Sequence, residues 1–321
     1  MTSRKTEAGE QGRDTVPPRT ARLFIHDSPT GFSSLWIKYC DRNAIPYRRV
    51  DVYSRDFWQE VKPNDILMWH YAPNAEKAER ILISLELANV LVFPNLQTRF
   101  GFDDKMAQGL FTEISGVPYA NTTVLLKRDE AKRYVEDCDL PVVFKLATGN
   151  SSNNVKLVRD RKSANTLIRR MFGPGSATYD RSGILKRRLT QFRRRQVGLS
   201  KVLSATIRLF FVPRHMKRRD HDYVLFQAFL PDNDSDMRIV VIDEKAFGMT
   251  RYNAPGDFRA SASGLIDHDP DKIDPEAVRL CFKAAKMLNT DCCAFDVLKT
   301  RAGGFEIIEF CFGFFTETLK H

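Results

Sequence analysis

Two acidic residues near the end of the chain, Asp296 and Glu309, have the spacing of neighbours in a β-hairpin. They lie inside the apolar runs 294–298 and 307–310, and Ala302-Gly303-Gly304 predicts the turn between them. Antiparallel pairing then brings both side chains together. Two ionised carboxylates in apolar surroundings repel each other and lose hydration. A Mg²⁺ ion resolves this conflict, and so does pairing with Arg or Lys; the spacing alone does not decide between them.

Two lysines have positions that suit an anionic ligand. Lys145 lies in the apolar strand 141–146 and precedes the polar loop 147–154, whose small residues could surround a phosphate with backbone N–H groups. The alternative is a lysine that reaches the strand edge, followed by an ordinary hairpin loop. Lys105 lies in the first turn of a helix for which Asp103 is the expected N-cap, where a positive charge is unfavourable without a ligand. A plain surface lysine is the alternative.

Three arginines lie on or near neighbouring strands. Arg238 is inside the strand 237–242, Arg251 is near the end of the strand 246–252, and Arg259 follows in the loop 256–261. Guanidinium groups bind phosphate or carboxylate oxygens in pairs. The alternative is surface pairing with Asp or Glu. The six histidines show no metal-binding spacing, and no two of the six cysteines form a C-x-x-C pair.

The elements that position these residues fall into two groups. In the first, strand patterns at 22–26, 47–52, 65–70 and 89–93 alternate with helical patterns at 32–43 and 75–87, which indicates a small parallel α/β subdomain. The second begins with the helix from Asp103 and has an α+β pattern. Its expected strands are 122–126, 142–146, 154–158, 223–230, 237–242, 246–252, 293–298 and 305–310, and its expected helices are 129–136, 163–171 and 275–288.

Composition and charge narrow the class of protein. The 321 residues are 43% hydrophobic and 28% charged, as in a soluble folded protein. No signal peptide or membrane span is evident, so we expect a cytoplasmic protein. Residues 1–20 have the composition of a disordered tail. The stretch 161–219 holds 17 Lys and Arg against one acid, Asp180, while the whole chain has a net charge of +10, so the basic charge is concentrated in one segment.

In order, these motifs resemble the ATP-grasp fold, and specifically the RimK-type ligases related to glutathione synthetase. The resemblance covers about 102–313 and rests on the following motifs: Asp-Lys at 104–105, Pro-Val-Val-Phe-Lys at 141–145, Phe-Gln-Ala-Phe-Leu at 226–230, Asp-Met-Arg at 236–238, Gly-Asp-Phe-Arg at 256–259, Asp296, and Ile-Ile-Glu at 307–309. More closely, parts of the chain resemble a branch associated with polysaccharide biosynthesis loci.

The resemblance implies a fold, two cofactors and a set of site residues. It implies a pre-ATP-grasp subdomain over 21–100 and two α+β lobes, 101–175 and 223–321, that enclose ATP and flank a basic insertion at 176–222. Lys105, Lys145 and the loop residues Asn150, Ser151 and Ser152 would contact phosphates, and Gln227, Ala228, Phe229 and Leu230 would bind adenine. Asp236 would accept from the ribose, Asp296 and Glu309 would hold Mg²⁺, and Arg238, Arg251 and Arg259 would face the phosphate and acyl substrate.

The implied activity is ATP-dependent carboxylate–amine ligation through an acylphosphate, acting on a sugar acid or a peptide. Because Cys311 stands where the family usually has an Asn ligand, a weakened nucleotide- or polyanion-binding protein is an alternative, and a kinase is another. The basic stretch Gly183–Arg219 mixes Arg with apolar residues. It suggests an anionic membrane surface at the inner face or a polyanionic glycan as partner, against a solvated basic hairpin; nucleic acid is disfavoured.

Overall fold

A computed structural model describes residues 21–28, 31–70, 75–148, 155–178, 185, 188–189, 192–193, 197–210, 219–260 and 263–314. The expected tail, the loop residues Asn150, Ser151 and Ser152, and much of the basic insertion lie outside these residues. The chain forms two compact units, one up to Phe93 and one from Pro94. The expected boundary was near residue 100. The predicted mixture of a parallel sheet with antiparallel sheets is confirmed.

The first unit is a four-stranded parallel sheet with the order β2-β1-β3-β4. Phe24, Ile25 and Leu67 from the strands are fully buried, and so are Leu82 and Leu85 of a helix. In a parallel sheet the crossover helices cover the strands, and this buries the short apolar runs. The elements are β1 (Leu23–His26), α1 (Ser33–Arg42), β2 (Arg48–Val50), α2 (Arg55–Glu60), β3 (Ile66–Met68), α3 (Ala75–Leu87) and β4 (Leu91–Phe93).

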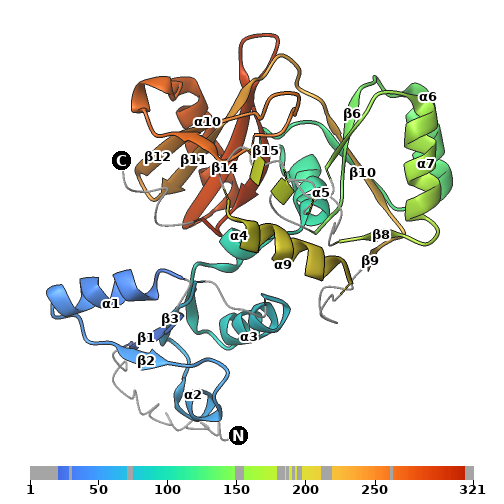
Figure 1. The fold of residues 1–321 in the computed structure, drawn as a ribbon. Coiled ribbons are helices and arrows are strands. Elements are labelled where there is room, and N and C mark those ends of the chain that lie inside the picture. The colour runs from blue at the N-terminus through green and yellow to red at the C-terminus, as the bar shows by residue number, and fades with distance from the viewer. Residues whose placement is uncertain are drawn as a thin grey trace, which may run out of the picture. The chain divides into compact units, whose positions relative to one another are not determined.

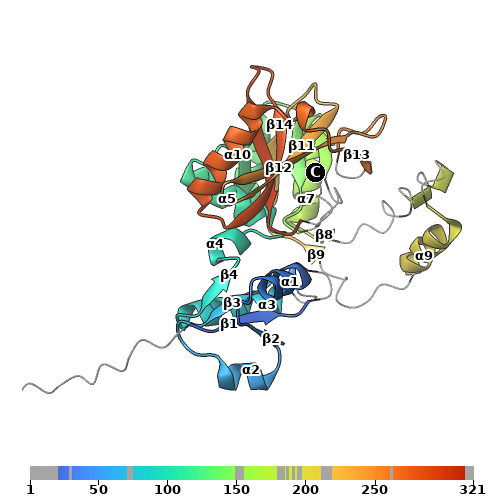
Figure 2. The same ribbon diagram turned by 90° about the vertical axis from the view of Figure 1, so that its left-hand side faces the viewer.

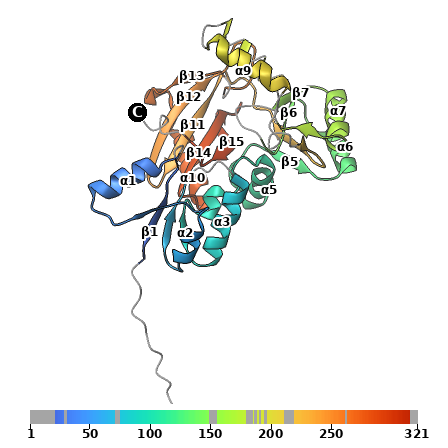
Figure 3. The ribbon, with the colours of Figure 1, turned by 60° about the horizontal axis from the view of Figure 1, so that its bottom comes forward.

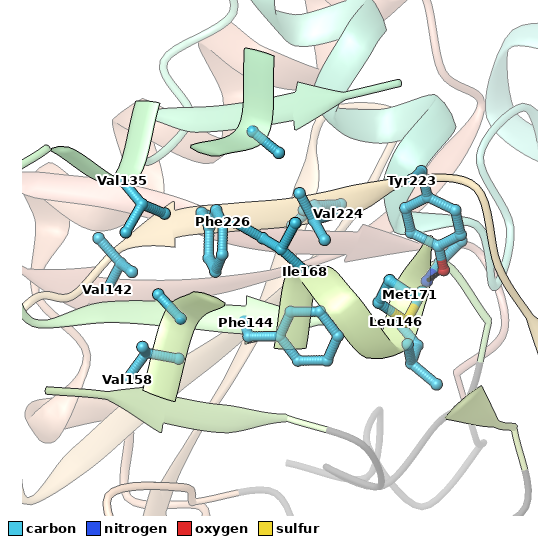
Figure 4. Packing of buried hydrophobic residues seen from close by; sticks show 14 residues of the cluster. Val135, Val142, Phe144, Leu146, Val158, Ile168, Met171, Tyr223, Val224 and Phe226 are labelled. Atoms are coloured by element: carbon cyan, nitrogen blue, oxygen red, sulfur yellow. Dashed lines mark hydrogen bonds between the residues drawn. The ribbon is translucent and has the colours of Figure 1, made fainter. Parts of the chain in front are cut away.

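The second unit contains two larger sheets. The first has the order β5-β10-β6-β7 and is antiparallel throughout. Helices α6 and α7 lie side by side on one face of it (Figure 1). In the core beneath them, Phe144 and Phe226 of the strands meet Ile168 of α7 (Figure 4). The elements are β5 (Thr122–Leu125), α6 (Arg128–Asp137), β6 (Val142–Lys145), β7 (Lys156–Val158), α7 (Arg161–Met171) and β10 (Val224–Ala228).

The other sheet has the order β13-β12-β11-β14-β15 and is also antiparallel. Helix α10 packs against one of its faces (Figure 2), where Cys281 and Ala284 meet Ile239, Phe295 and Ile307. Figure 3 shows β11, β12, β14 and β15 side by side. The elements are β11 (Ser235–Ile242), β12 (Lys245–Tyr252), β13 (Leu265–Asp267), α10 (Pro275–Leu288), β14 (Cys292–Lys299) and β15 (Phe305–Cys311).

Helix α5 (Lys105–Ser115) joins the two sheets of the second unit, because it packs on both β5 and β15. Its N-cap is Asp104, whose side chain accepts from the Ala107 N–H, so the expectation that Asp103 caps the helix is wrong. The expected stop at Gly116 is confirmed, with a left-handed backbone that glycine adopts without strain. Smaller elements are α4 (Leu96–Arg99), β8 (Ser176–Ala177), α9 (Leu199–Phe210), β9 (Arg219–Asp220) and the 3₁₀ turn Pro270–Lys272.

Hydrogen bonds to the turn before β14 explain why α4 belongs to the second unit. Asn95 caps α4, and its backbone N–H donates to Asp291 Oδ2 at 2.7 Å. The Asp291 N–H in turn donates to Thr98 Oγ1 at 2.7 Å. These bonds fix α4 to the turn before β14, and a division at residue 100 would separate these partners.

Candidate active site

The five candidate residues on the β11–β15 sheet lie on one face of it. Successive side chains of a strand point to opposite faces, and direct partners point to the same face. Arg238 is the partner of Asp296, Asp236 is the partner of Arg251, and Asp296 is the partner of Glu309. The intervening residues Ile239, Phe295 and Ile307 are buried in the core that contains α10 residues. The charged row therefore occupies the face opposite α10.

The predicted pairing of Asp296 with Glu309 is confirmed, and the ladder is irregular immediately beside it. The next pair along the strands is Val297 with Ile307, so Ile308 is an extra residue in β15. Such a bulge redirects the backbone of the bulged residue. The Ile308 carbonyl accepts from Lys145 Nζ at 3.1 Å, from Gln227 Nε2 at 3.3 Å and from the Tyr119 hydroxyl at 3.0 Å. The bulge thus joins β15 to strands β6 and β10 of the other sheet.

Asp296 is held by two arginines. Arg238 binds both of its oxygens, at 2.7 and 2.9 Å, and Arg251 Nη2 lies 2.8 Å from Oδ2. Arg251 also binds both oxygens of Asp236, at 2.6 and 2.7 Å. Burial works against ionisation of Asp296, but the two guanidinium groups outweigh it and hold its pKa far below the usual range. The carboxyl remains ionised at neutral pH.

Asp236 differs from Asp296 in its pKa, because the arginine that pairs with it, Arg251, also binds Asp296. Burial is the largest influence and raises its pKa to about 6, with Arg251 opposing this and the charge of Asp296 adding to it. The side chain is 6% exposed. Asp236 is therefore engaged with Arg251, and in its expected role a ribose hydroxyl would share this carboxylate with that guanidinium.

Glu309 is paired with Lys105 of α5, at 3.3 Å. Lys105 is 4% exposed, and its backbone N–H donates to the Ala147 carbonyl just after β6, at 2.9 Å. Burial lowers the pKa of this lysine, but the charges of Glu309 and Asp103 outweigh burial and raise it. Asp296 and Glu309 are therefore both paired with cations, which is one of the two arrangements that their spacing in the sequence allowed.

Lys145 does not reach the strand edge, contrary to the simplest expectation for a lysine in an apolar strand. It is 6% exposed and donates to the Ile308 carbonyl. Burial lowers its pKa to about 8; Glu309 opposes the shift and Lys105 adds to it. Lys105 and Lys145 thus place two amino groups beside Glu309.

Arg259 pairs with Asp257, at 2.8 Å from both oxygens, and lies over the Phe258 ring at 5.8 Å. Its Nη1 also donates to the Val155 carbonyl at 3.5 Å. Val155 immediately follows the loop that contains Asn150, Ser151 and Ser152, which lies outside the described residues. Arg259 therefore connects the loop after β12 to the residue that precedes β7, whereas Arg238 and Arg251 meet at Asp296.

The expected adenine-binding segment begins at the end of β10. Gln227 is 3% exposed and donates to Thr122 Oγ1 at 2.9 Å, and the Ala228 N–H donates to the Asn121 carbonyl. Phe229 contacts Phe258 edge-to-face at 6.0 Å. Beyond Leu230, Asn233 Nδ2 donates to the carbonyls of Leu230, Pro231 and Lys299. This amide fixes the chain where it passes from one sheet to the other.

Cys311 lies on the same face as Glu309, opposite Ala294. The Gly313 N–H donates to its sulfur at 3.1 Å. Burial raises the pKa of the thiol to about 12, so the neutral form is present at neutral pH. Within the described ranges, no group of three or more His, Cys, Asp or Glu side chains is arranged to hold a metal ion. Two carboxylates nevertheless match the oxygen donors that a phosphate-bound Mg²⁺ takes from protein.

Two site residues had not been identified from sequence. Gln108 of α5 donates to the Phe310 carbonyl at 2.8 Å and accepts from the Phe310 N–H at 3.4 Å, so its amide continues the ladder beyond β15. Tyr119 donates to Gln108 Oε1 as well as to Ile308, and its burial raises its pKa well above the usual range. The sequence signal that could have identified Gln108 was its three-residue spacing from Lys105, which places both residues on one helix face.

Comparisons with known proteins agree with this architecture. Residues 203–311 match the family model of the RimK-like ATP-grasp domain. A search of the curated proteins found no match.

Among the described helices, none is long and apolar enough to cross a bilayer.

Solved structures of ATP-grasp proteins resemble most of the chain. A RimK domain protein from Sphaerobacter thermophilus DSM 20745 has 16% identity and a TM-score of 0.53, covering 92% of this chain and 93% of that one. D-cycloserine synthetase DcsG has 13% identity and a TM-score of 0.54, with 91% of each chain covered. The ATP-grasp ligase PsnB, in complex with a minimal precursor, Mg and ADP, has 11% identity and a TM-score of 0.50, covering 91% and 89%. The chain therefore has the ATP-grasp fold, and its residues 203–311 are similar to the RimK-like ATP-grasp domain.

Proposed function

We propose that this protein is an ATP-dependent carboxylate–amine ligase that forms an amide through an acylphosphate. The observation that carries the proposal is the meeting of Asp296 and Glu309 on one sheet face with Lys105 and Lys145, which arrive from α5 and β6. Two carboxylates among buried cations suit a metal–triphosphate complex: Lys105 and Lys145 would pair with the phosphates, and Asp296 and Glu309 would hold the metal ion.

The residues have distinct proposed roles. Lys105, Lys145 and the loop Asn150–Ser152 bind phosphates, Gln227–Leu230 bind adenine through backbone groups, and Asp236 accepts from the ribose. Asp296 and Glu309 hold Mg²⁺, which neutralises charge on the phosphates. PsnB, solved with Mg and ADP, supports these two ligands by analogy of fold. Arg238, Arg251 and Arg259 face the transferring phosphate and the acyl substrate.

The chemistry proceeds in two steps. An oxygen of the substrate carboxylate attacks the γ-phosphorus, the bond to the β-phosphate oxygen breaks, and ADP leaves. An amine nitrogen then attacks the acyl carbon, loses a proton, and phosphate leaves with the former carboxylate oxygen. Lysines and arginines positioned around the transferring group stabilise its charge without having to reorganise, which is where such cations contribute most.

Hydroxylamine provides a test that does not require the natural amine. With Mg²⁺, ATP and a panel of sugar acids and peptides, wild type should release phosphate and form a hydroxamate from the accepted acid. Asp296→Asn and Glu309→Gln should lower the rate at least about a hundredfold, the scale seen when one charge-stabilising group is removed. Glu244→Gln, on the exposed β11–β12 turn, is the matched control. Phosphorylation of a hydroxyl without hydroxamate would instead identify a kinase.

A second candidate is a nucleotide- or polyanion-binding protein with weakened or lost activity. It is favoured by Cys311, a poor ligand for Mg²⁺, and by the ion pairs that already occupy Asp296 and Glu309. Binding of Mg-ATP without turnover on any acid and amine would support it over the ligase.

The setting of the reaction is a further part of the proposal. We place it in the cytoplasm, on a sugar acid or peptide used in polysaccharide or cell-envelope biosynthesis. The concentration of positive charge in Gly183–Arg219 supports an anionic partner, either a membrane surface at its inner face or a polyanionic glycan.

A further inference from the structure

Helix α9 (Leu199–Phe210) exposes apolar side chains within the basic segment. Val202 and Ala205 are buried, whereas Leu199, Leu203 and Ile207 are 66%, 60% and 52% exposed. These three are spaced four residues apart, so they form a continuous ridge along one side of the helix. Leu189 and Phe192, earlier in the same segment, are each 40% exposed. Single exposed apolar residues are ordinary, but a contiguous ridge marks a surface that meets a partner.

The sequence on both sides of the ridge is basic. Residues 186–195 contain six Lys and Arg, residues 214–219 contain four, and no acid occurs from 181 to 219. A segment whose sequence combines basic clusters of this size with an apolar helix face has the composition of an element that lies in the interface of an anionic membrane.

We propose that α9 docks the protein on an anionic lipid bilayer. Leu199, Leu203 and Ile207 enter the interfacial region, and the net positive charge of the segment attracts it to the anionic headgroups. This inference rests on the anionic partner proposed above and identifies that partner as the headgroups of a lipid bilayer. A polyanionic glycan would bind the charge but leave the apolar ridge in water, and a second copy of the chain would bring two strongly basic segments together.

Vesicle sedimentation of the full-length protein tests the proposal. Wild type should bind vesicles that contain phosphatidylglycerol and should bind vesicles of phosphatidylcholine alone at least about tenfold less well. The triple variant Leu199→Ser, Leu203→Ser, Ile207→Ser should lose about tenfold in binding to the anionic vesicles. The control is Leu87→Ser with Ile114→Ser, which removes side chains that are 82% and 89% exposed outside α9 and should bind like wild type.

Charge is tested separately by Arg188→Gln with Arg193→Gln, which should weaken binding and reduce its dependence on salt. Circular dichroism and nucleotide binding confirm that each variant is folded. If the triple variant binds vesicles as well as wild type does, and dextran sulfate displaces every variant from them, the proposal is overturned in favour of a glycan site. A wild-type dimer that the triple variant loses without lipid would overturn it in favour of self-association. Hydroxamate formation, measured in lipid-free buffer, judges the ligase proposal independently.

Discussion

At the scale of single residues, the site is a set of buried and half-buried charges that pair with one another. Asp296 and Asp236 share Arg251, Asp296 also binds Arg238, and Glu309 binds Lys105. Buried ions are tolerated only when they are paired. Among the described residues of the site, Lys145 differs, because its amino group donates to the neutral Ile308 carbonyl. An anionic ligand therefore gains most from meeting Lys145.

Lys145 should make nucleotide binding coupled to proton uptake. Its pKa of about 8 leaves the amine largely neutral at pH 8.5, and a triphosphate beside it would raise that pKa and draw in a proton. Calorimetry in buffers of different ionisation enthalpy should show uptake of roughly three quarters of a proton per nucleotide at pH 8.5. At pH 6.5 the amine is already charged, so its contribution should fall to nearly zero.

Lys145→Arg is the control for this coupling. Arg remains charged throughout this pH range, so the variant should bind nucleotide with the Lys145 contribution to proton uptake removed. Equal uptake by variant and wild type at pH 8.5 would assign the proton to another group.

At the scale of elements, the site depends on how α5 and the chain after it meet the edge of β15. Tyr119 forms a bridge with Ile307, the Ala120 N–H donates to the Ile307 carbonyl, and Gln108 satisfies both backbone groups of Phe310. The chain then enters β5 of the other sheet. An exposed strand edge is thereby covered, and α5 is placed so that Lys105 meets Glu309.

Gln108→Leu should test this connection. The substitution removes the side-chain partners of the Phe310 N–H and carbonyl, and an unsatisfied buried group costs about 1–3 kcal/mol. We expect urea unfolding to show a loss of this size, together with weaker nucleotide binding. Gln97→Leu, at an exposed position of α4, should change stability by no more than about 0.5 kcal/mol. Similar stability of the two variants would show that the Gln108 amide does not support β15.

At the scale of the whole molecule, every described nucleotide and metal candidate lies in the second unit. Lys105, Lys145, Gln227, Asp236, Asp296 and Glu309 all follow Pro94. Both sheets of that unit contribute to the site, and the first unit supplies a separate parallel sheet. Binding of nucleotide should therefore stabilise the two units unequally.

Hydrogen exchange with and without Mg-ATP measures this difference. Ligand should slow exchange in β6, β10, β11, β14 and β15, because a ligand that binds the folded form at 100 times its Kd stabilises it by about 2.7 kcal/mol. Strands β1–β4 should show little change. Chelation of the metal with EDTA should reduce the protection. Protection of β1–β4 equal to that of β14 would place the nucleotide elsewhere.

The sequence by itself determined the elements and the central hairpin. The Gly303 turn indicated that the strands of Asp296 and Glu309 pair, but the register that starts at Lys299 and Phe305 would place Ile308 opposite Asp296. The bulge at Ile308, which the structure revealed, is what places Glu309 there. Local signals identified α5 and its end at Gly116, although the cap is Asp104. The short helices α2 and α4 and the short strand β13 were not predicted. Patterns of this kind depend on neighbours within a few residues, which sequence displays directly.

Only the tertiary structure decided how the charges are distributed. Arg238, Arg251 and Lys105 come from β11, β12 and α5, and the bulge at Ile308 turns a carbonyl toward Lys145 from β6. Which cation meets which carboxylate depends on the register of several strands and on helix placement, and residues as distant in sequence as Lys105 and Glu309 make these contacts. Spacing along the chain carries no such information, because an ion pair forms wherever packing brings opposite charges together.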